Sequence, residues 1–182
     1  MKRGAGAMKA RASAWLVVAA AAAALCLSMA PPLLVHGGHA RAGTAIRIAL
    51  APICHQDPAR SFHLAARPMG VCARCAGVQA GFLAASLALA GAVRARRKAP
   101  LRPPRPVVLT LAAAPMAAQW LLARLPLGYP ALDGNPVRAL TGALFGVALS
   151  TYVLPAVVEM VEEITHARRL PRSEERTDVA TA

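Results

Sequence analysis

The chain has 182 residues, of which 57% are hydrophobic and only 16% charged, and its formal net charge is +13. Soluble domains carry about 25% charged residues, so the composition argues against a soluble protein, and the length leaves room for one domain. The basic residues fall in clumps between apolar runs and accompany no nucleic-acid-binding motif. We therefore expect a lipid bilayer and not a nucleic acid as the partner.

Four apolar runs follow one another along the chain, and a transmembrane helix needs about 20 such residues. The runs cover residues 13–35, 76–93, 106–123 and 137–158. Pro31 and Pro32 are expected to end the regular helix of the first run, and Pro115 is expected to kink the third. The sequence therefore predicts an all-α membrane protein, a bundle of about four transmembrane helices with an extracytoplasmic loop that contains cysteine and histidine.

The first run has a second interpretation, a signal peptide cleaved near Ala40-Arg41-Ala42. The run is about twice as long as a normal signal-peptide core, and Pro31-Pro32 interrupts the approach to the cleavage site, so we expect a retained helix.

Lysine and arginine residues beside the helices predict the orientation. The basic N-terminus 1–12, the linker 94–105 and the polar tail 159–182 carry more of them than the segments 36–75 and 125–136. We therefore expect an inner-membrane protein whose two termini and linker face the cytoplasm. The transmembrane domain is residues 13–158, with an outer loop at 36–75 and an outer turn at 125–136.

Three of the four cysteines lie together in the outer loop. The group begins at Cys54-His55-Gln56-Asp57 and ends at Cys72-Ala73-Arg74-Cys75, with Arg60 and His63 between them. Thiolate and imidazole are ligands that suit zinc, which takes four in a closed structural site. We expect a metal site, with zinc as the ion, whose ligands are Cys54, Cys72, Cys75 and either His55 or His63.

Charged residues surround this predicted site and two of them come from the outer turn. They would form a polar shell around the metal or contact an anion, and they are Arg60, Arg74, Asp133 and Arg138.

Two other functions use the same cysteines. Cys72 and Cys75 form a C-x-x-C motif at the start of a helix, where the macrodipole and Arg74 would lower a thiol pKa. A thiol–disulfide oxidoreductase could cycle this pair, with Cys54 as a third thiol. The third interpretation is a structural or assembly subunit of a membrane complex, in which a partner protein or a second copy binds the chain.

Other polar and small residues inside the spans are expected to serve packing. Gly77-x3-Gly81 and Gly142-x3-Gly146 allow helices to approach closely. The amides of Gln79 and Gln119 are expected to hydrogen-bond a neighbouring helix, and Cys26 to be a packing residue. Ser61 lies near Asp57 and His63 in sequence, but sequence neighbours do not make a catalytic triad.

One sequence string carries a family resemblance. It begins Cys54-His55-Gln56-Asp57-Pro58-Ala59-Arg60-Ser61-Phe62 and continues at Pro68, Val71-Cys72-Ala73-Arg74-Cys75 and Gly77. It resembles the bacterial and archaeal membrane proteins grouped as domain of unknown function 2085, DUF2085. A second element also matches: Asp133-Gly134, then Asn135-x2-Arg138-x2-Thr141-Gly142-x3-Gly146. The resemblance implies the membrane fold and this choice of residues, but it implies no reaction.

Overall fold

The computed structural model describes residues 2–95, 103–125 and 133–167, which are mostly helical. The elements in chain order are α1 (Lys2–His36), α2 (Ala40–Leu50), η1 (Pro58–Arg60), β1 (His63–Leu64), β2 (Arg67–Pro68), α3 (Ala73–Ala95), α4 (Val107–Leu122) and α5 (Asn135–Ala167). Most of the predicted tail, of the linker and of the outer turn falls outside these residues, while residues 159–167 of the tail belong to α5.

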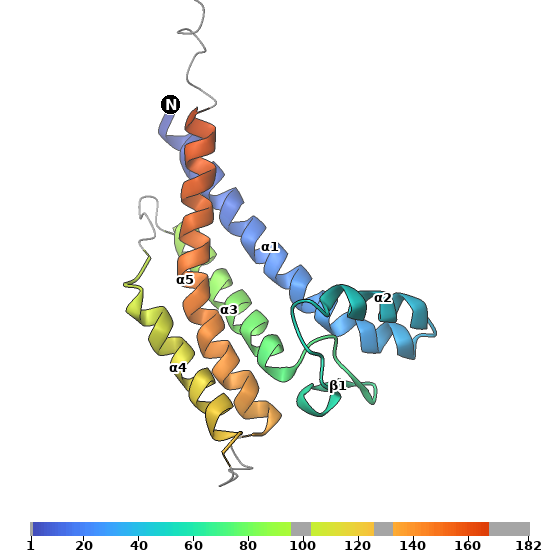
Figure 1. Cartoon of the computed structure of the whole chain (residues 1–182). Helices are drawn as coiled ribbons and strands as arrows, with labels where there is room; N and C mark the ends of the chain where they lie inside the picture. Colours follow the sequence, from blue (N-terminus) through green and yellow to red (C-terminus); the bar gives the residue numbers. More distant parts are fainter. Residues whose placement is uncertain (1, 96–102, 126–132, 168–182) are drawn as a thin grey trace, which may run out of the picture.

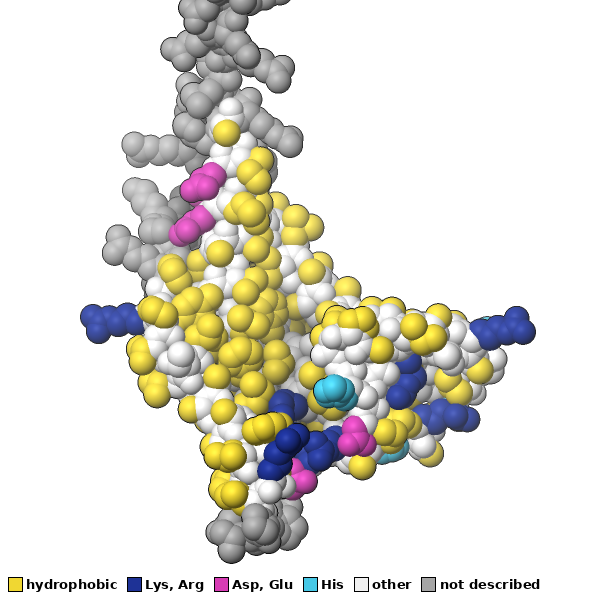
Figure 2. All heavy atoms as spheres, viewed as in Figure 1, with side chains coloured by type: hydrophobic (Ala, Val, Ile, Leu, Met, Phe, Trp, Pro, Cys, Tyr) yellow, Lys and Arg dark blue, Asp and Glu magenta, His cyan; other side chains and the backbone are white. Residues whose placement is uncertain are grey.

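Three helices are long and apolar enough to cross a membrane: Arg11–His36, Ala73–Val93 and Asn135–Ile164. The predicted third span is α4, an apolar helix of 16 residues. Its length of about 24 Å is less than the hydrocarbon thickness of about 30 Å. Large hydrophobic side chains such as Leu16, Leu111 and Leu140 point outward, and hydrophobic atoms cover the bundle in Figure 2. The all-α membrane fold is thus confirmed, with three long apolar helices that can span a membrane and one shorter apolar helix, α4.

Glycines bring α3 and α5 into backbone contact. The four that line the contact are Gly77, Gly81, Gly142 and Gly146. A Cβ on Gly77 would lie 2.1 Å from the carbonyl oxygen of Ala139, and one on Gly146 would lie 2.1 Å from that of Val78. Gly77 meets Ala139 and Gly81 meets Ala143, so residue numbers increase in the same direction along both helices. α3 and α5 therefore run parallel (Figure 1). The predicted packing role of both small-x3-small patterns is confirmed.

The parallel packing separates the two ends of the bundle. The N-terminal end of α1 and the last turns of α5 lie at the top of Figure 1. α3 and α5 begin at the bottom, beside the segment between α2 and α3 (residues 51–72, the cysteine segment). In the middle of the contact the buried hydroxyls of Ser86 and Ser150 are 2.9 Å apart. The predicted outer loop leads into α3 and the predicted outer turn leads into α5, so both join the bundle at the same end.

The prediction that Pro31 and Pro32 end the first helix is wrong, because α1 continues to His36. Pro32 has no N–H to give to the carbonyl of Ser28, four residues earlier. The backbone N–H of Gly70 donates to that carbonyl instead, at 2.8 Å. A partner from another segment therefore satisfies the acceptor that proline frees, and the helix continues.

The predicted outer loop contains a helix that the sequence analysis missed. After a turn at Gly38 (φ 84°) the chain folds back as α2, which packs along the end of α1 and projects sideways from the bundle (Figure 1). Gly43 permits this approach, since a Cβ there would lie 2.9 Å from the carbonyl oxygen of Pro31.

The glycine contact gives a stability prediction with a matched control. Gly146→Ala is expected to lower the thermal midpoint, because the added methyl group meets backbone and overpacking costs about 1–3 kcal/mol. Gly91→Ala adds the same methyl group in α3, where it would meet no atom within 4 Å, and should stabilise by about 0.5–1 kcal/mol. Thermal unfolding in detergent measures both, and equal midpoints would contradict the close packing.

Candidate functional site

The cysteine segment lies between α2 and α3 and is shaped by short local contacts. The Asp57 carboxylate caps η1 by accepting the N–H of Ala59 at 3.0 Å. β1 and β2 then form a hairpin whose turn residues, Ala65 and Ala66, both have positive φ. Left-handed backbone is costly for alanine, so contacts around the hairpin must hold it. The segment returns to the bundle at Cys72.

Three thiols meet where this segment joins α3. The sulfur atoms of Cys54, Cys72 and Cys75 all lie within 4.8 Å of one another. Cys54 is buried, and its sulfur accepts the backbone N–H of Cys72 at 3.2 Å. Apolar residues pack around the cluster: Leu50, Met69, Val71 and Ala76. α3 begins at Ala73, three residues earlier than the predicted span, so Cys75 sits in its first turn.

Hydrogen bonding stabilises the thiolate of Cys72. The Cys75 side chain makes the largest contribution, with backbone N–H groups and the Cys54 side chain adding to it, and together they outweigh burial and lower the pKa of Cys72 to about 5. None of the four cysteines is in a disulfide. The cluster therefore presents an anionic sulfur at neutral pH, which can bind a metal ion or act as a nucleophile.

This pKa can be checked on metal-stripped protein. Alkylation of Cys72 needs the thiolate, so its rate should stay high as pH falls and decline only near pH 5, whereas an ordinary thiol already slows below about pH 8.5. Cys75→Ala removes the largest stabilising contact and should move the decline upward. Mass spectrometry of the alkylated peptide measures both, and a decline near pH 8.5 in the unaltered protein would contradict the lowered pKa.

The two candidate histidines are not part of the sulfur group. His55 and His63 are both exposed, and the described cluster of potential metal ligands contains the three cysteines alone. Arg60 is also exposed and pairs with Asp57 at 3.3 Å. The hydroxyl of Ser61 donates to the backbone carbonyl of Asp57 at 2.7 Å.

The other three predicted residues of the polar shell lie at the starts of α3 and α5. Arg138 is buried, pairs with Asp133, and donates to Asn135 at 3.2 Å. The side chain of Asn135 donates to the carbonyl of Ser61 at 3.1 Å, which ties α5 to the cysteine segment. Arg74 donates to Gln119 of α4. The predicted interhelical role of Gln119 is thus confirmed.

Several residues that position the site were missed by the sequence analysis. Arg47 of α2 donates to the carbonyls of Pro68 and Gln56, at 3.4 and 3.5 Å, and the Gln56 side chain donates back to the carbonyl of Arg47 at 2.6 Å. In α1 the Ser28 hydroxyl donates to Gln79 of α3 at 2.9 Å, which confirms the interhelical role of Gln79. Pro32 could have indicated that the Ser28 carbonyl needs a donor from another segment, because proline has no N–H. No feature of the sequence indicated the contacts of Arg47.

The comparisons with known proteins agree with the membrane fold. A family model described as "Predicted membrane protein (DUF2085)" matches residues 54–152. The "Uncharacterized protein MJ1492" of Methanocaldococcus jannaschii is 31% identical over 109 residues, which are 60% of this chain and 66% of that protein. The matched region therefore spans somewhat less than two thirds of the relative. No solved structure matches the chain.

Proposed function

Because this chain belongs to the DUF2085 family of predicted membrane proteins, we propose a function that a membrane protein can perform with three clustered thiols. In this proposal the protein binds a zinc ion at an extracytoplasmic site formed by Cys54, Cys72 and Cys75. The observation that carries the proposal is the approach of the three sulfur atoms to within 4.8 Å of one another. Sulfur atoms that share a tetrahedral zinc at about 2.3 Å lie about 3.8 Å apart, so small side-chain movements would close the site.

The fourth ligand is assigned to His55 or His63. His55 follows Cys54 directly, and His63 lies in β1 of the same segment. Both imidazoles are exposed, so a rotation of either side chain would leave no cavity behind. Arg60, Arg74, Asp133 and Arg138 would then surround the metal or contact an anion near it.

Zinc content tests this proposal directly. Full-length protein purified from its own membrane should contain about one zinc per chain, and chelation should expose three thiols to alkylation. Replacement of Cys54, Cys72 or Cys75 by serine should remove most of the metal. Cys26→Ser is the matched control, because Cys26 is an exposed thiol of α1 outside the cluster, and it should keep the metal.

The histidine variants identify the fourth ligand, since His55→Ala or His63→Ala should weaken zinc retention when that residue binds. Absence of metal from unaltered protein, or equal zinc in Cys54→Ser, would contradict the site.

A thiol–disulfide oxidoreductase is the second candidate, favoured by the lowered pKa of Cys72. The Cys72 thiolate would attack a disulfide of a partner and release one partner thiol. Cys75 would then displace the second partner sulfur and leave a Cys72–Cys75 disulfide. Metal-free protein with a readily reducible Cys72–Cys75 disulfide would favour this reaction.

The third candidate is a structural or assembly subunit. It would remain if Cys54→Ser changed neither the metal content nor the redox state of the thiols nor the abundance of the protein.

The proposed location of the site is the outer face of the inner membrane, with both termini in the cytoplasm. Cys26→Ser protein leaves thiols only in the cluster. After chelation and mild reduction, a membrane-impermeant thiol reagent should label the cysteine cluster of this variant in intact cells. Spheroplasts replace intact cells where an outer membrane blocks the reagent. Labelling that requires lysis would reverse the orientation, and it would also move the domain assignments 1–12 and 159–182 outside.

A further inference from the structure

A second polar group lies beside the cysteine cluster, at the starts of α3 and α5. Because the two helices are parallel, their N-termini meet at one end of the bundle (Figure 1). Helix N-termini carry partial positive charge and favour anions, but neither first turn contains an acidic residue. Each helix instead has an arginine in its first turn, Arg74 in α3 and Arg138 in α5. Both the helix ends and the arginine side chains therefore carry positive charge.

The chain has few carboxylates to balance this charge. Of its 8 acidic residues, only Asp57 and Asp133 precede residue 159, and these two pair with Arg60 and Arg138. Glu159 lies on α5 about 36 Å from the start of the helix. Among the residues that the structure describes, no carboxylate is therefore left for Arg74 at this end.

The guanidinium of Arg74 keeps hydrogen-bonding capacity that its neighbours do not use. Its hydrogen-bond partner Gln119 is a neutral amide that is 4% exposed. Its Nε is buried and has no hydrogen-bond partner among the described residues. Burying part of a charged group without a counter-charge is costly. Since Arg74 is only partly buried, an anion can reach the guanidinium and supply that charge.

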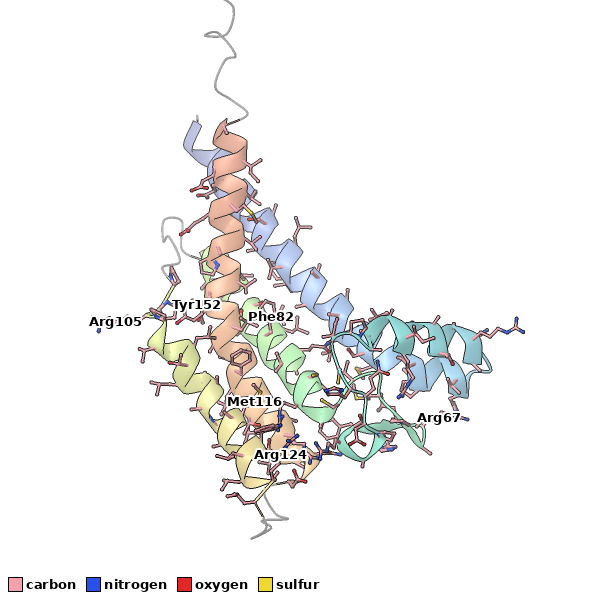
Figure 3. The ribbon with its side chains drawn as sticks, in the orientation of Figure 1. Arg67, Phe82, Arg105, Met116, Arg124 and Tyr152 are labelled. Carbon is pink, nitrogen blue, oxygen red and sulfur yellow. The ribbon has the colours of Figure 1, made fainter. Side chains whose placement is uncertain are left out.

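The surrounding residues indicate which anion fits. Arg124 of the α4 end stacks over Trp120, 4.1 Å from the ring centroid. Trp120 is 46% exposed, and tryptophan at the end of a span is typical of the headgroup region. Figure 3 places Arg124 at the bottom of α4 near the start of α5, and Figure 2 shows basic side chains gathered at this end of the molecule. Basic pockets between transmembrane helices bind lipid phosphates, and guanidinium groups match phosphate geometry.

We propose that the starts of α3 and α5, with Arg74 as the central residue, bind a phosphate group from an anionic phospholipid or from free phosphate. The site does not depend on the zinc proposal, because its donors are arginines and helix N-termini and include none of the cysteines.

Two measurements on full-length protein in detergent test the proposal. Native mass spectrometry should show that phosphatidylglycerol remains bound in preference to phosphatidylcholine if the source is lipid. Titration with inorganic phosphate should show binding if the source is free. In either case Arg74→Gln should weaken binding about tenfold or more, the effect of losing one charge-assisted hydrogen bond. Arg105→Gln is the matched control, because Arg105 is an exposed arginine just before α4. This variant should bind phosphate or phosphatidylglycerol as tightly as the unaltered protein.

Gln119→Glu provides a second variant that does not depend on removing Arg74. A carboxylate beside the guanidinium supplies the counter-charge from within the chain and should weaken anion binding by a similar factor. Zinc content should not change in Gln119→Glu, because Gln119 has no place in the proposed metal site. The proposal is overturned if the unaltered protein binds neither phosphate nor phosphatidylglycerol selectively, or if both variants bind as well as the Arg105→Gln control.

Discussion

The close parallel contact between α3 and α5 is the constraint on which the rest of the structure depends. Gly77, Gly81, Gly142 and Gly146 let the two backbones touch, and any side chain at these positions would separate them. Because the helices are parallel, both begin at the same end of the bundle. Cys75, Arg74 and Arg138 all belong to these first turns, so one packing contact places the thiols and the basic group at a single membrane face.

The cysteine segment is held against this face by polar contacts from three helices. The Ser28 carbonyl of α1 accepts Gly70, Arg47 of α2 bonds the carbonyls of Pro68 and Gln56, and Asn135 of α5 bonds Ser61. Each contact uses a backbone group of a segment that has almost no regular structure of its own. Such fixation limits the movement of Cys54 relative to α3, and a preformed ligand set loses less entropy when it binds a metal.

The sequence predicted the helices well because long apolar runs and small-x3-small patterns are local signals. It also predicted that the three thiols of one loop would lie together, but the described group of possible metal ligands does not include His55 or His63. It failed at Pro31 and Pro32 because the partner that rescues the helix, Gly70, is remote in sequence. It missed α2 because residues 40–50 mix alanine with Arg41, Thr44 and Arg47 and show no long apolar run. The fourth metal ligand depends on side-chain orientation, which spacing does not determine.

The central claim is that the three thiols bind one zinc ion, and X-ray absorption at the zinc edge tests it most directly. Protein purified from its own membrane should show about three sulfur atoms near 2.3 Å and one nitrogen or oxygen near 2.0–2.1 Å from each zinc. A sample without zinc, or zinc surrounded only by nitrogen and oxygen, would contradict the account.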